Sequence, residues 1–289
     1  MENPVPYNAS LNLYFRGASN LRAALADFKA RFGVHAPEEV VVTGGSAGGL
    51  STTLHVDFIG AFLGAAFVAG VPQCGWFPFW AAPCAGPTEK GSLMCNATGA
   101  FFDTVALQNA TGALSAECKA AQGASGEWRC FMAAVATPFV KAPLFVWQSK
   151  FDHFQLSSFL SVDCSYSQAY NPPWNPAPVC SPNNTADIFA FGRYFMQQLQ
   201  PLIAAPGPHR ALYLTSCVLH GMDYNFLTVG GNAAGELGTT PSVAFNLWYR
   251  ALRSPTAADP GNNWKWVENL EAPRVDNPLA CPPFVFSQY

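Results

Sequence analysis

Charged side chains are scarce in this chain. Asp, Glu, Lys and Arg make up only 11% of the 289 residues, and the formal net charge is −3. So few basic residues provide no positive face for a polyanion, which excludes nucleic acid as a partner. The low charge does not indicate disorder, because half of the residues are hydrophobic and 14% are aromatic. The composition predicts a single packed domain over residues 1–289 that acts on neutral or polar substrates.

Long hydrophobic runs are also lacking. The longest apolar stretch, residues 58–71, contains three glycines and falls short of the roughly 20 residues that a membrane-spanning helix needs. Residues 1–4 have neither the basic start nor the apolar centre of a signal peptide. We therefore expect no membrane span, and we expect the chain to be a fragment of a longer one.

Signatures of metal and nucleotide sites are missing as well. The sequence has no His-Glu-x-x-His motif and no paired Cys-x-x-Cys motifs. Its one Gly-rich segment lacks the lysine of a phosphate-binding loop and has a serine at the turn. We therefore expect neither a metal ion nor another cofactor.

Cysteine, proline and N-glycosylation signals are present together. The chain has nine cysteines, 24 prolines and Asn-x-Ser/Thr sequences at Asn8, Asn96, Asn109 and Asn183. Buried thiols and chance matches are the plain alternative. The combination favours a secreted glycoprotein with disulfide bonds, folded in an oxidising compartment. Because nine is an odd number, at least one cysteine is either a free thiol or bonded to a group outside this chain.

The hydrophobic pattern predicts an α/β fold. Strands are expected at residues 11–15, 40–43 and 65–71, and helices are expected after a cap at Ser19 and over residues 47–63. This β-α-β-α-β order with short connections indicates a mainly parallel sheet with helices on both faces.

The rest of the chain alternates between regular and irregular segments. Loop excursions are expected at about residues 75–125 and 164–184, the second a candidate lid flanked by Cys164 and Cys180. The aromatic residues of the first excursion suit either a cleft or the core. Further elements are expected at residues 128–135 (helix), 142–148 (strand), from about 184 (helix), 211–215 (strand) and from 240 (helix), before a coil-rich tail from residue 263.

Residues 40–50, Val-Val-Val-Thr-Gly-Gly-Ser-Ala-Gly-Gly-Leu, form the most informative motif. A strand runs into small residues around Ser46 and then into a helix, as in the nucleophile elbow of serine hydrolases. The turn is so sharp that only small residues fit beside the serine. An ordinary strand-to-helix turn is the alternative. The context favours Ser46 as a nucleophile, with the Ala47 N–H as a donor of the oxyanion hole.

A serine nucleophile needs a base and an acid on loops after later strands. Asp152 follows the strand expected at residues 142–148, and His220 follows the one at residues 211–215. This order matches Ser, acid, His, so we predict Asp152 as the acid and His220 as the base. Asp223 is the rival acid, although it lies after His220. The competing histidines fit less well because of their places in the chain, and these are His35, His55, His153 and His209.

The chain resembles the pectin acetylesterase family, which also includes the carboxylesterase Notum. Three blocks carry the resemblance: residues 13–17 (Leu-Tyr-Phe-Arg-Gly), residues 44–58 around Ser46, and residues 216–220 (Ser-Cys-Val-Leu-His). Residues 143–156 are similar to the family's acid-bearing loop. The resemblance implies an α/β-hydrolase fold and a secreted esterase with Ser46, Asp152 and His220 as its triad.

The sequence departs from the family in two places. Residues 73–77, Gln-Cys-Gly-Trp-Phe, lack an aspartate that plant members have there. The family also has an N-terminal stretch with the early strands and a Gly-rich oxyanion loop, which implies that these strands are lacking here and that residues 11–15 form a sheet edge.

The expected function is therefore a secreted or cell-wall serine carboxylesterase. It would remove short acyl groups, such as acetyl, from a polysaccharide like pectin through an acyl-enzyme. Two alternatives stay open: a Notum-like deacylase of a lipidated protein, and a non-catalytic carbohydrate-binding relative.

Overall fold

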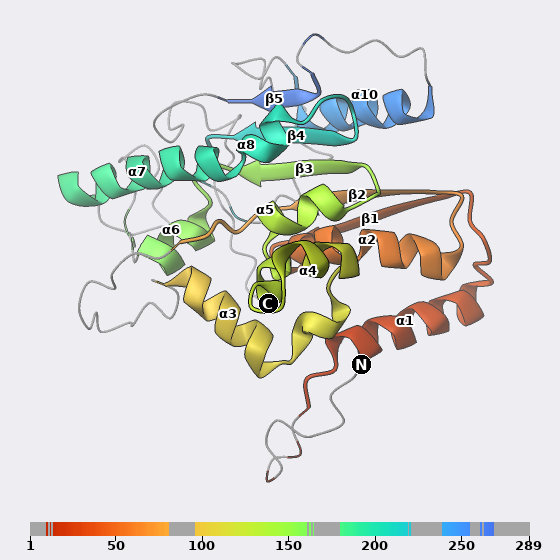
Figure 1. Ribbon diagram of the computed structural model, residues 1–289. Coiled ribbons are helices and arrows are strands. Elements are labelled where there is room, and N and C mark those ends of the chain that lie inside the picture. The colour runs from red at the N-terminus through yellow and green to blue at the C-terminus, as the bar shows by residue number, and fades with distance from the viewer. Residues whose placement is uncertain are drawn as a thin grey trace.

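The computed structural model describes residues 10, 12, 14–80, 96–160, 162, 164, 180–218, 220, 239–254, 261 and 263–268. The strands among these residues form one parallel sheet, in the order β1-β2-β3-β4-β5 (Figure 1). The strands are β1 (Glu39–Gly45), β2 (Phe67–Gln73), β3 (Leu144–Ser149), β4 (Arg210–Thr215) and β5 (Lys265–Val267). Because all are parallel, their carboxyl ends share one edge of the sheet.

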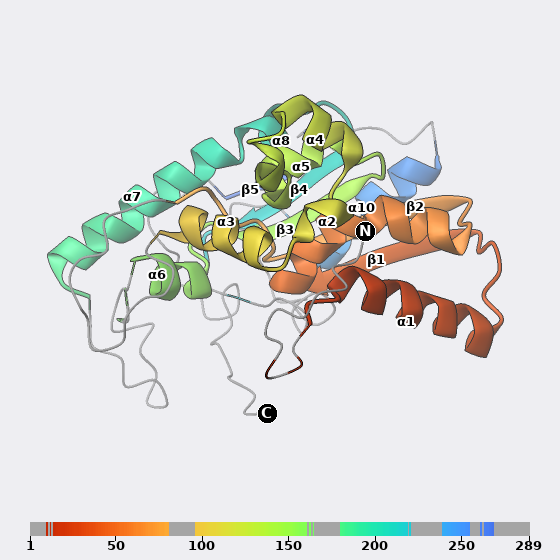
Figure 2. The same ribbon diagram turned by 60° about the horizontal axis from the view of Figure 1, so that its bottom comes forward.

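Helices connect and cover these strands (Figures 1 and 2). The α-helices are α1 (Gly17–Phe32), α2 (Ala47–Leu63), α3 (Ala97–Leu107), α4 (Ala116–Gln122), α5 (Ala133–Ala136), α6 (His153–Leu160), α7 (Pro182–Gln198), α8 (Gln200–Ala204) and α10 (Pro241–Arg253). Short 3₁₀ turns are η1 (Ala110–Ala113), η2 (Glu127–Phe131) and η3 (Thr137–Phe139).

Strand β3 divides the core into two layers. All six of its residues are buried, as expected of a parallel strand covered on both faces. Leu144 and Val146 join the cluster that contains buried residues of α2 and α7. Phe145 and Trp147 join a second cluster with Trp248 of α10. The expected α/β fold with helices on both faces is therefore confirmed.

Two charged side chains tie the amino ends of β3 and β4 to α2. The carboxylate of Asp57 accepts hydrogen bonds from the backbone N–H groups of Lys141 and Ala142, each at 2.8 Å. The guanidinium of Arg210 donates to the carbonyl of Ala142 at 2.9 Å and to that of Thr137 at 3.2 Å. Burial lowers the pKa of Arg210, and the nearby Asp57 charge opposes that shift. These contacts fix the start of β3 against the helix that follows β1.

The start of the chain differs from the sequence-based expectation. Residues 12, 14 and 15 are not in a strand, while residues 11 and 13 lie outside the described part. The predicted strand at residues 11–15 is therefore wrong for the residues described, and β1 has β2 as its only partner among the described strands. Helix α1 begins at Gly17 without a side-chain cap, so the expected cap at Ser19 is also wrong.

Helix α1 leaves its apolar side chains largely uncovered. It lies beside α2 in both views (Figures 1 and 2), where Lys29 donates to the carbonyl of Phe62 at 3.1 Å. None of its residues is buried, and Phe32 is 70% exposed. On the adjoining edge strand, Val41 is 42% exposed. The apolar periodicity of the helix predicted its existence but not its degree of burial.

Two further expectations have clear outcomes. Lys265–Val267 pairs with β4 as a short strand that the expected coil-rich tail from residue 263 did not include. No helix in the described part of the chain is long and apolar enough to cross a membrane.

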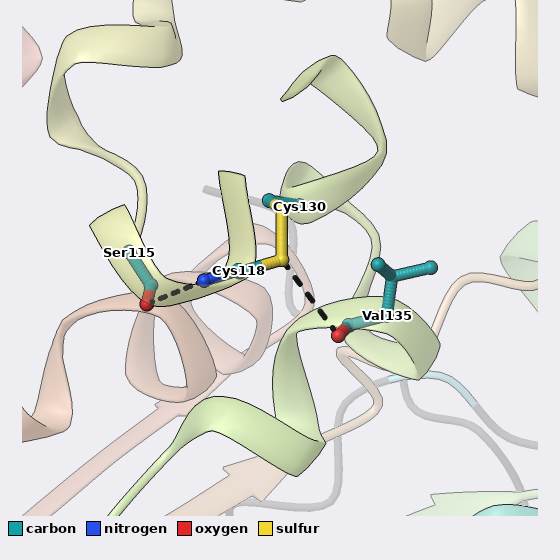
Figure 3. The surroundings of a disulfide bond; sticks show 4 residues. All are labelled: Ser115, Cys118, Cys130 and Val135. Carbon is teal, nitrogen blue, oxygen red and sulfur yellow. Dashed lines mark hydrogen bonds between the residues drawn. A yellow bond between two sulfur atoms is a disulfide. The ribbon is translucent and has the colours of Figure 1, made fainter. Parts of the chain in front are cut away.

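Disulfides join described cysteines in both excursions. Cys118–Cys130 links α4 to η2, and Figure 3 shows the Ser115 hydroxyl accepting the Cys118 N–H at 3.3 Å beside it. Cys164–Cys180 closes the second excursion, whose residues 165–179 lie outside the described part. Cys217 is also disulfide-bonded, whereas Cys74 is a buried thiol. Disulfide formation is therefore confirmed.

The close contact between α2 and the end of β2 gives a first prediction. A Cβ added at Gly49 would lie 2.3 Å from the Gln73 carbonyl oxygen and 3.0 Å from the Gly75 Cα, whereas one at Gly48 would meet nothing within 4 Å. Gly49→Ala should therefore lower the free energy of unfolding by about 1–3 kcal/mol. Gly48→Ala is the matched control and should be neutral or stabilising by up to about 1 kcal/mol. Urea unfolding measures both, and equal effects would contradict the packing.

Candidate active site

Ser46 occupies a strained turn between β1 and α2. Its backbone has φ 57° and ψ −121°, a region that residues with a side chain rarely adopt. The Ser46 N–H donates to the carbonyl of Gln73 at 2.9 Å, and the Ser46 carbonyl accepts from the Leu50 N–H at 3.0 Å. These bonds hold the turn between the end of β2 and the first turn of α2, with the Ser46 hydroxyl at the carboxyl edge of the sheet.

His220 lies between Ser46 and Asp152. Its Nε2 is 2.7 Å from the Ser46 Oγ, and its Nδ1 is 2.8 and 2.9 Å from the two carboxylate oxygens of Asp152. The Asp152 side chain is fully buried, while that of His220 is 17% exposed. A carboxylate can only accept here, so Nδ1 carries the proton and Nε2 is left to accept from the serine hydroxyl. This is the arrangement that a general base needs.

Asp152 is held by the helix that it caps. It directly precedes α6, and its Oδ1 accepts the Gln155 N–H at 3.1 Å, the usual bond of an N-cap aspartate. Its Oδ2 accepts a longer bond of 3.4 Å from the side-chain amide of Gln148. Because the carboxylate has no access to solvent, these donors and the imidazole N–H replace its water.

The same two glutamines hold the backbone of Trp76. Gln148 Oε1 accepts the Trp76 N–H at 3.1 Å, and Gln155 Nε2 donates to the Trp76 carbonyl at 3.0 Å. The first excursion is thereby joined to the loop that carries Asp152. The aromatic residues of this excursion were expected either to line a cleft or to pack in the core. Trp76 and Phe77 are both buried, so these two pack in the core.

Two buried groups hold the loop before His220. The Ser149 hydroxyl donates to the carbonyl of Cys217. Glu268, buried just after β5, accepts the Ser216 N–H at 2.7 Å through its carboxylate. The ends of β3 and β5 therefore position the segment that leads from β4 to the histidine.

An aromatic ring covers one side of the imidazole. The ring centroids of Phe154 and His220 are 5.1 Å apart, and the two ring planes are tilted by 32° to each other. The ring centroids of Phe77 and Phe159 lie 6.3 and 6.4 Å from that of Phe154. The histidine therefore lies against the end of an aromatic cluster that continues into the core.

The structure also places the competing residues. His35 and His209 are exposed and precede β1 and β4, His55 lies within α2, and His153 begins α6. Among the histidines of the described residues, His220 is the one whose ring nitrogen lies 2.7 Å from the Ser46 hydroxyl. Asp223 lies outside the described residues. Ala47 is the first residue of α2, where a backbone N–H has no partner within the helix, and its oxyanion role stays a prediction.

Sequence reasoning missed several residues of the site. Gln148, Gln155 and Glu268 hold its loops, and Cys74 lies beside the acid and base. The Cys74 sulfur, an Asp152 carboxylate oxygen and a His220 ring nitrogen are all within 4.8 Å of one another. The available signal was the place of Cys74 directly after a strand, because the carboxyl ends of parallel strands share one edge.

Comparison with known proteins gives the family. The chain matches the family model for pectinacetylesterases over residues 2–261. It belongs to that family. The resemblance seen in the sequence motifs is thus confirmed.

Relatives within the pectinacetylesterase family are distant. The chain is 27% identical to pectin acetylesterase 7 of Arabidopsis thaliana over 243 residues, which cover 82% of this chain and 56% of that protein. It is 30% identical to the palmitoleoyl-protein carboxylesterase NOTUM of Schmidtea mediterranea over 154 residues, 50% of this chain and 28% of the relative. The chain thus spans about half, or less, of these relatives' length.

A solved structure shares the fold. The Wnt deacylase Notum from Drosophila superimposes with a TM-score of 0.64 at 23% identity, covering 91% of this chain and 67% of that one. This likeness supports the α/β-hydrolase-like architecture of this pectinacetylesterase family member.

The second prediction concerns His55 in the elbow helix. Burial lowers its pKa from 6.5 in the folded protein, so protonation favours the unfolded chain. The stability that neutral His55 contributes is fully present above about pH 6.5 and is lost as the pH falls through the lower folded pKa. The free energy of unfolding should therefore decrease with falling pH below 6.5, and His55→Gln should reduce that slope. Exposed His209 provides the control: equal slopes in His55→Gln and His209→Gln would contradict the assignment.

Proposed function

We propose that this chain is a secreted serine carboxylesterase that removes acetyl and similar short acyl groups from a polysaccharide such as pectin. The observation that carries the proposal is the continuous hydrogen-bonded series from the Ser46 hydroxyl through His220 to the buried Asp152. Serine, aspartate and histidine occur in the chain order of α/β hydrolases and follow β1, β3 and β4.

The geometry gives each group a role in acyl transfer. His220 Nε2 takes the hydroxyl proton as the Ser46 Oγ attacks the ester carbonyl, and the Ala47 N–H stabilises the oxyanion that forms. Asp152 stabilises the imidazolium, which then returns the proton to the leaving alcohol. Water, deprotonated by His220, attacks the acyl-enzyme and releases the carboxylic acid and the free Ser46 hydroxyl.

The names of the relatives support ester hydrolysis. Pectin acetylesterase 7 and the palmitoleoyl-protein carboxylesterase NOTUM are both named for cleaving esters. They differ in the acyl group, which is short in acetyl and long in palmitoleoyl. Family membership therefore supports the reaction type, and the choice of acyl group has to be argued from the site.

The aromatic ring beside His220 favours a short acyl group. The Phe154 ring lies against the base, and the rings of Phe77 and Phe159 lie next to it. A long acyl chain would need room that these rings occupy. A deacylase of a lipidated protein is the second candidate, because two of the relatives carry that name. The assembled hydrogen-bond series weighs against a non-catalytic carbohydrate-binding protein, which has no use for it.

Disulfide bonds support secretion. Cys118–Cys130 and Cys164–Cys180 are formed between described residues. Such bonds persist in oxidising compartments and are rare in the cytosol.

The third prediction tests the nucleophile. Ser46→Ala should lower kcat for p-nitrophenyl acetate by about 10⁴-fold or more, because the attacking oxygen is removed. Ser51→Ala alters an exposed serine in the same helix and should keep wild-type activity. Circular dichroism confirms that both variants fold. Retention of most activity by folded Ser46→Ala would exclude Ser46 as the nucleophile.

The fourth prediction tests the acyl group. Among p-nitrophenyl esters of increasing acyl length, acetate should have the highest kcat/KM. Phe154→Ala should raise the ratio of kcat/KM for octanoate to kcat/KM for acetate by about tenfold, the effect of one to two extra methylenes in an apolar pocket. The change removes the ring that contacts His220. Phe159→Ala truncates the same cluster without that contact and is the control.

Both variants should lose stability, up to about 3–5 kcal/mol for a fully buried ring, so rates are compared at a temperature where all proteins are folded. A wild-type optimum at octanoate or longer would replace the proposed substrate with a lipidated one. An unchanged ratio in Phe154→Ala would show that this ring does not limit acyl length.

A further inference from the structure

Cys74 lies at the carboxyl edge of the sheet, beside the proposed acid and base. It directly follows β2, and its N–H donates to the carbonyl of Trp147 in β3 at 2.9 Å. Its backbone has a positive φ of 47°, and its side chain is fully buried. This position brings the thiol close to Asp152 and His220. The Cys74 sulfur, a carboxylate oxygen of Asp152 and a ring nitrogen of His220 all lie within 4.8 Å of one another.

The three side chains have the ligand types that zinc prefers. Thiolate, imidazole and carboxylate bind Zn²⁺ at about 2.0–2.3 Å, so ligand atoms around a tetrahedral ion are roughly 3.3–3.7 Å apart. To reach this spacing, the Cys74 sulfur needs to move toward the Asp152 oxygen and the His220 nitrogen by about 1 Å or less. The Asp152 oxygen and the His220 Nδ1, now 2.8 Å apart, need to move apart by about 1 Å or less.

The charges of this cluster also suit a divalent cation. A Cys74 thiolate and the Asp152 carboxylate provide two negative charges, and neutral His220 adds none. A bound Zn²⁺ therefore makes the buried group electrically neutral, which removes the main cost of burying its charges. Binding releases one proton, from the Cys74 sulfur, while the proton of neutral His220 moves from Nδ1 to Nε2. The partly exposed His220 provides the side from which the ion and a fourth ligand, water, arrive.

We propose that Cys74, Asp152 and His220 form an inhibitory site for Zn²⁺ and similar transition-metal ions. The ion takes the place of the Nδ1 proton between acid and base. His220 then no longer has Asp152 to orient it and stabilise its charge, so it cannot serve as the base for Ser46. Inhibition rests on the proposed esterase activity, whereas binding of the ion does not.

Cobalt binding tests the site without any activity measurement. Co²⁺ added to the purified wild-type chain should produce a thiolate-to-cobalt charge-transfer absorption that saturates at one equivalent, and Zn²⁺ should displace it. Cys74→Ser, which keeps the size of the side chain, should lack this band. Ser46→Ala is the matched control and should keep it, because Ser46 is not a ligand. Absence of the band in the wild type, or its persistence in Cys74→Ser, would overturn the proposal.

Zinc inhibition tests the consequence. In metal-free buffer, Zn²⁺ should inhibit p-nitrophenyl acetate hydrolysis by the wild type, and a chelator should restore the rate. Cys74→Ser should need at least about tenfold more Zn²⁺ for half-inhibition, relative to its own metal-free rate, because one ligand is lost. Equal half-inhibition in both proteins would assign the effect to other residues and refute the inhibitory role. If the wild type shows no esterase activity, the proposed function fails while the cobalt band still decides the metal site.

Discussion

The buried carboxylate of Asp152 is the interaction on which the arrangement of this site depends. A charged group without access to water is stable only if donors surround it. Here the donors come from the imidazole of His220, the backbone of Gln155 and the side chain of Gln148. Each of these residues also bonds elsewhere: His220 to Ser46, and both glutamines to the backbone of Trp76. Satisfying one charge therefore fixes the base, the start of a helix and the first excursion together.

The parts predicted correctly from the sequence depend on local chemistry and chain order. The strand, small-residue turn and helix around Ser46 are adjacent in sequence, and only a sharp turn suits them. Asp152 and His220 were chosen because each follows a strongly apolar strand, and the structure brings both side chains together at Ser46; their catalytic roles stay a prediction. The helix expected from residue 240 is α10, which begins at Pro241 after a Thr240 cap.

The errors arise where tertiary contacts decide. Residues 11–15 alternate like a strand, but a strand also needs a partner, and the described residues among them have none in the sheet. Lys265–Val267 is too short to show any period, yet β4 recruits it. The contacts of Cys74, Gln148 and Glu268 depend on side-chain directions at the ends of different strands, and no spacing in a single sequence encodes these.

Asp57 has a consequence for how much the molecule can vary. Helix α2 starts immediately after Ser46 and, through Asp57, holds the backbone just before β3, the strand that leads to Asp152. One helix therefore links the positions of Ser46 and Asp152 directly, in addition to the long stretch of chain between them. Insertions, deletions and new side chains can accumulate in that stretch without misaligning the reacting groups. The residues between α2 and β3 can therefore vary without moving Ser46 relative to Asp152.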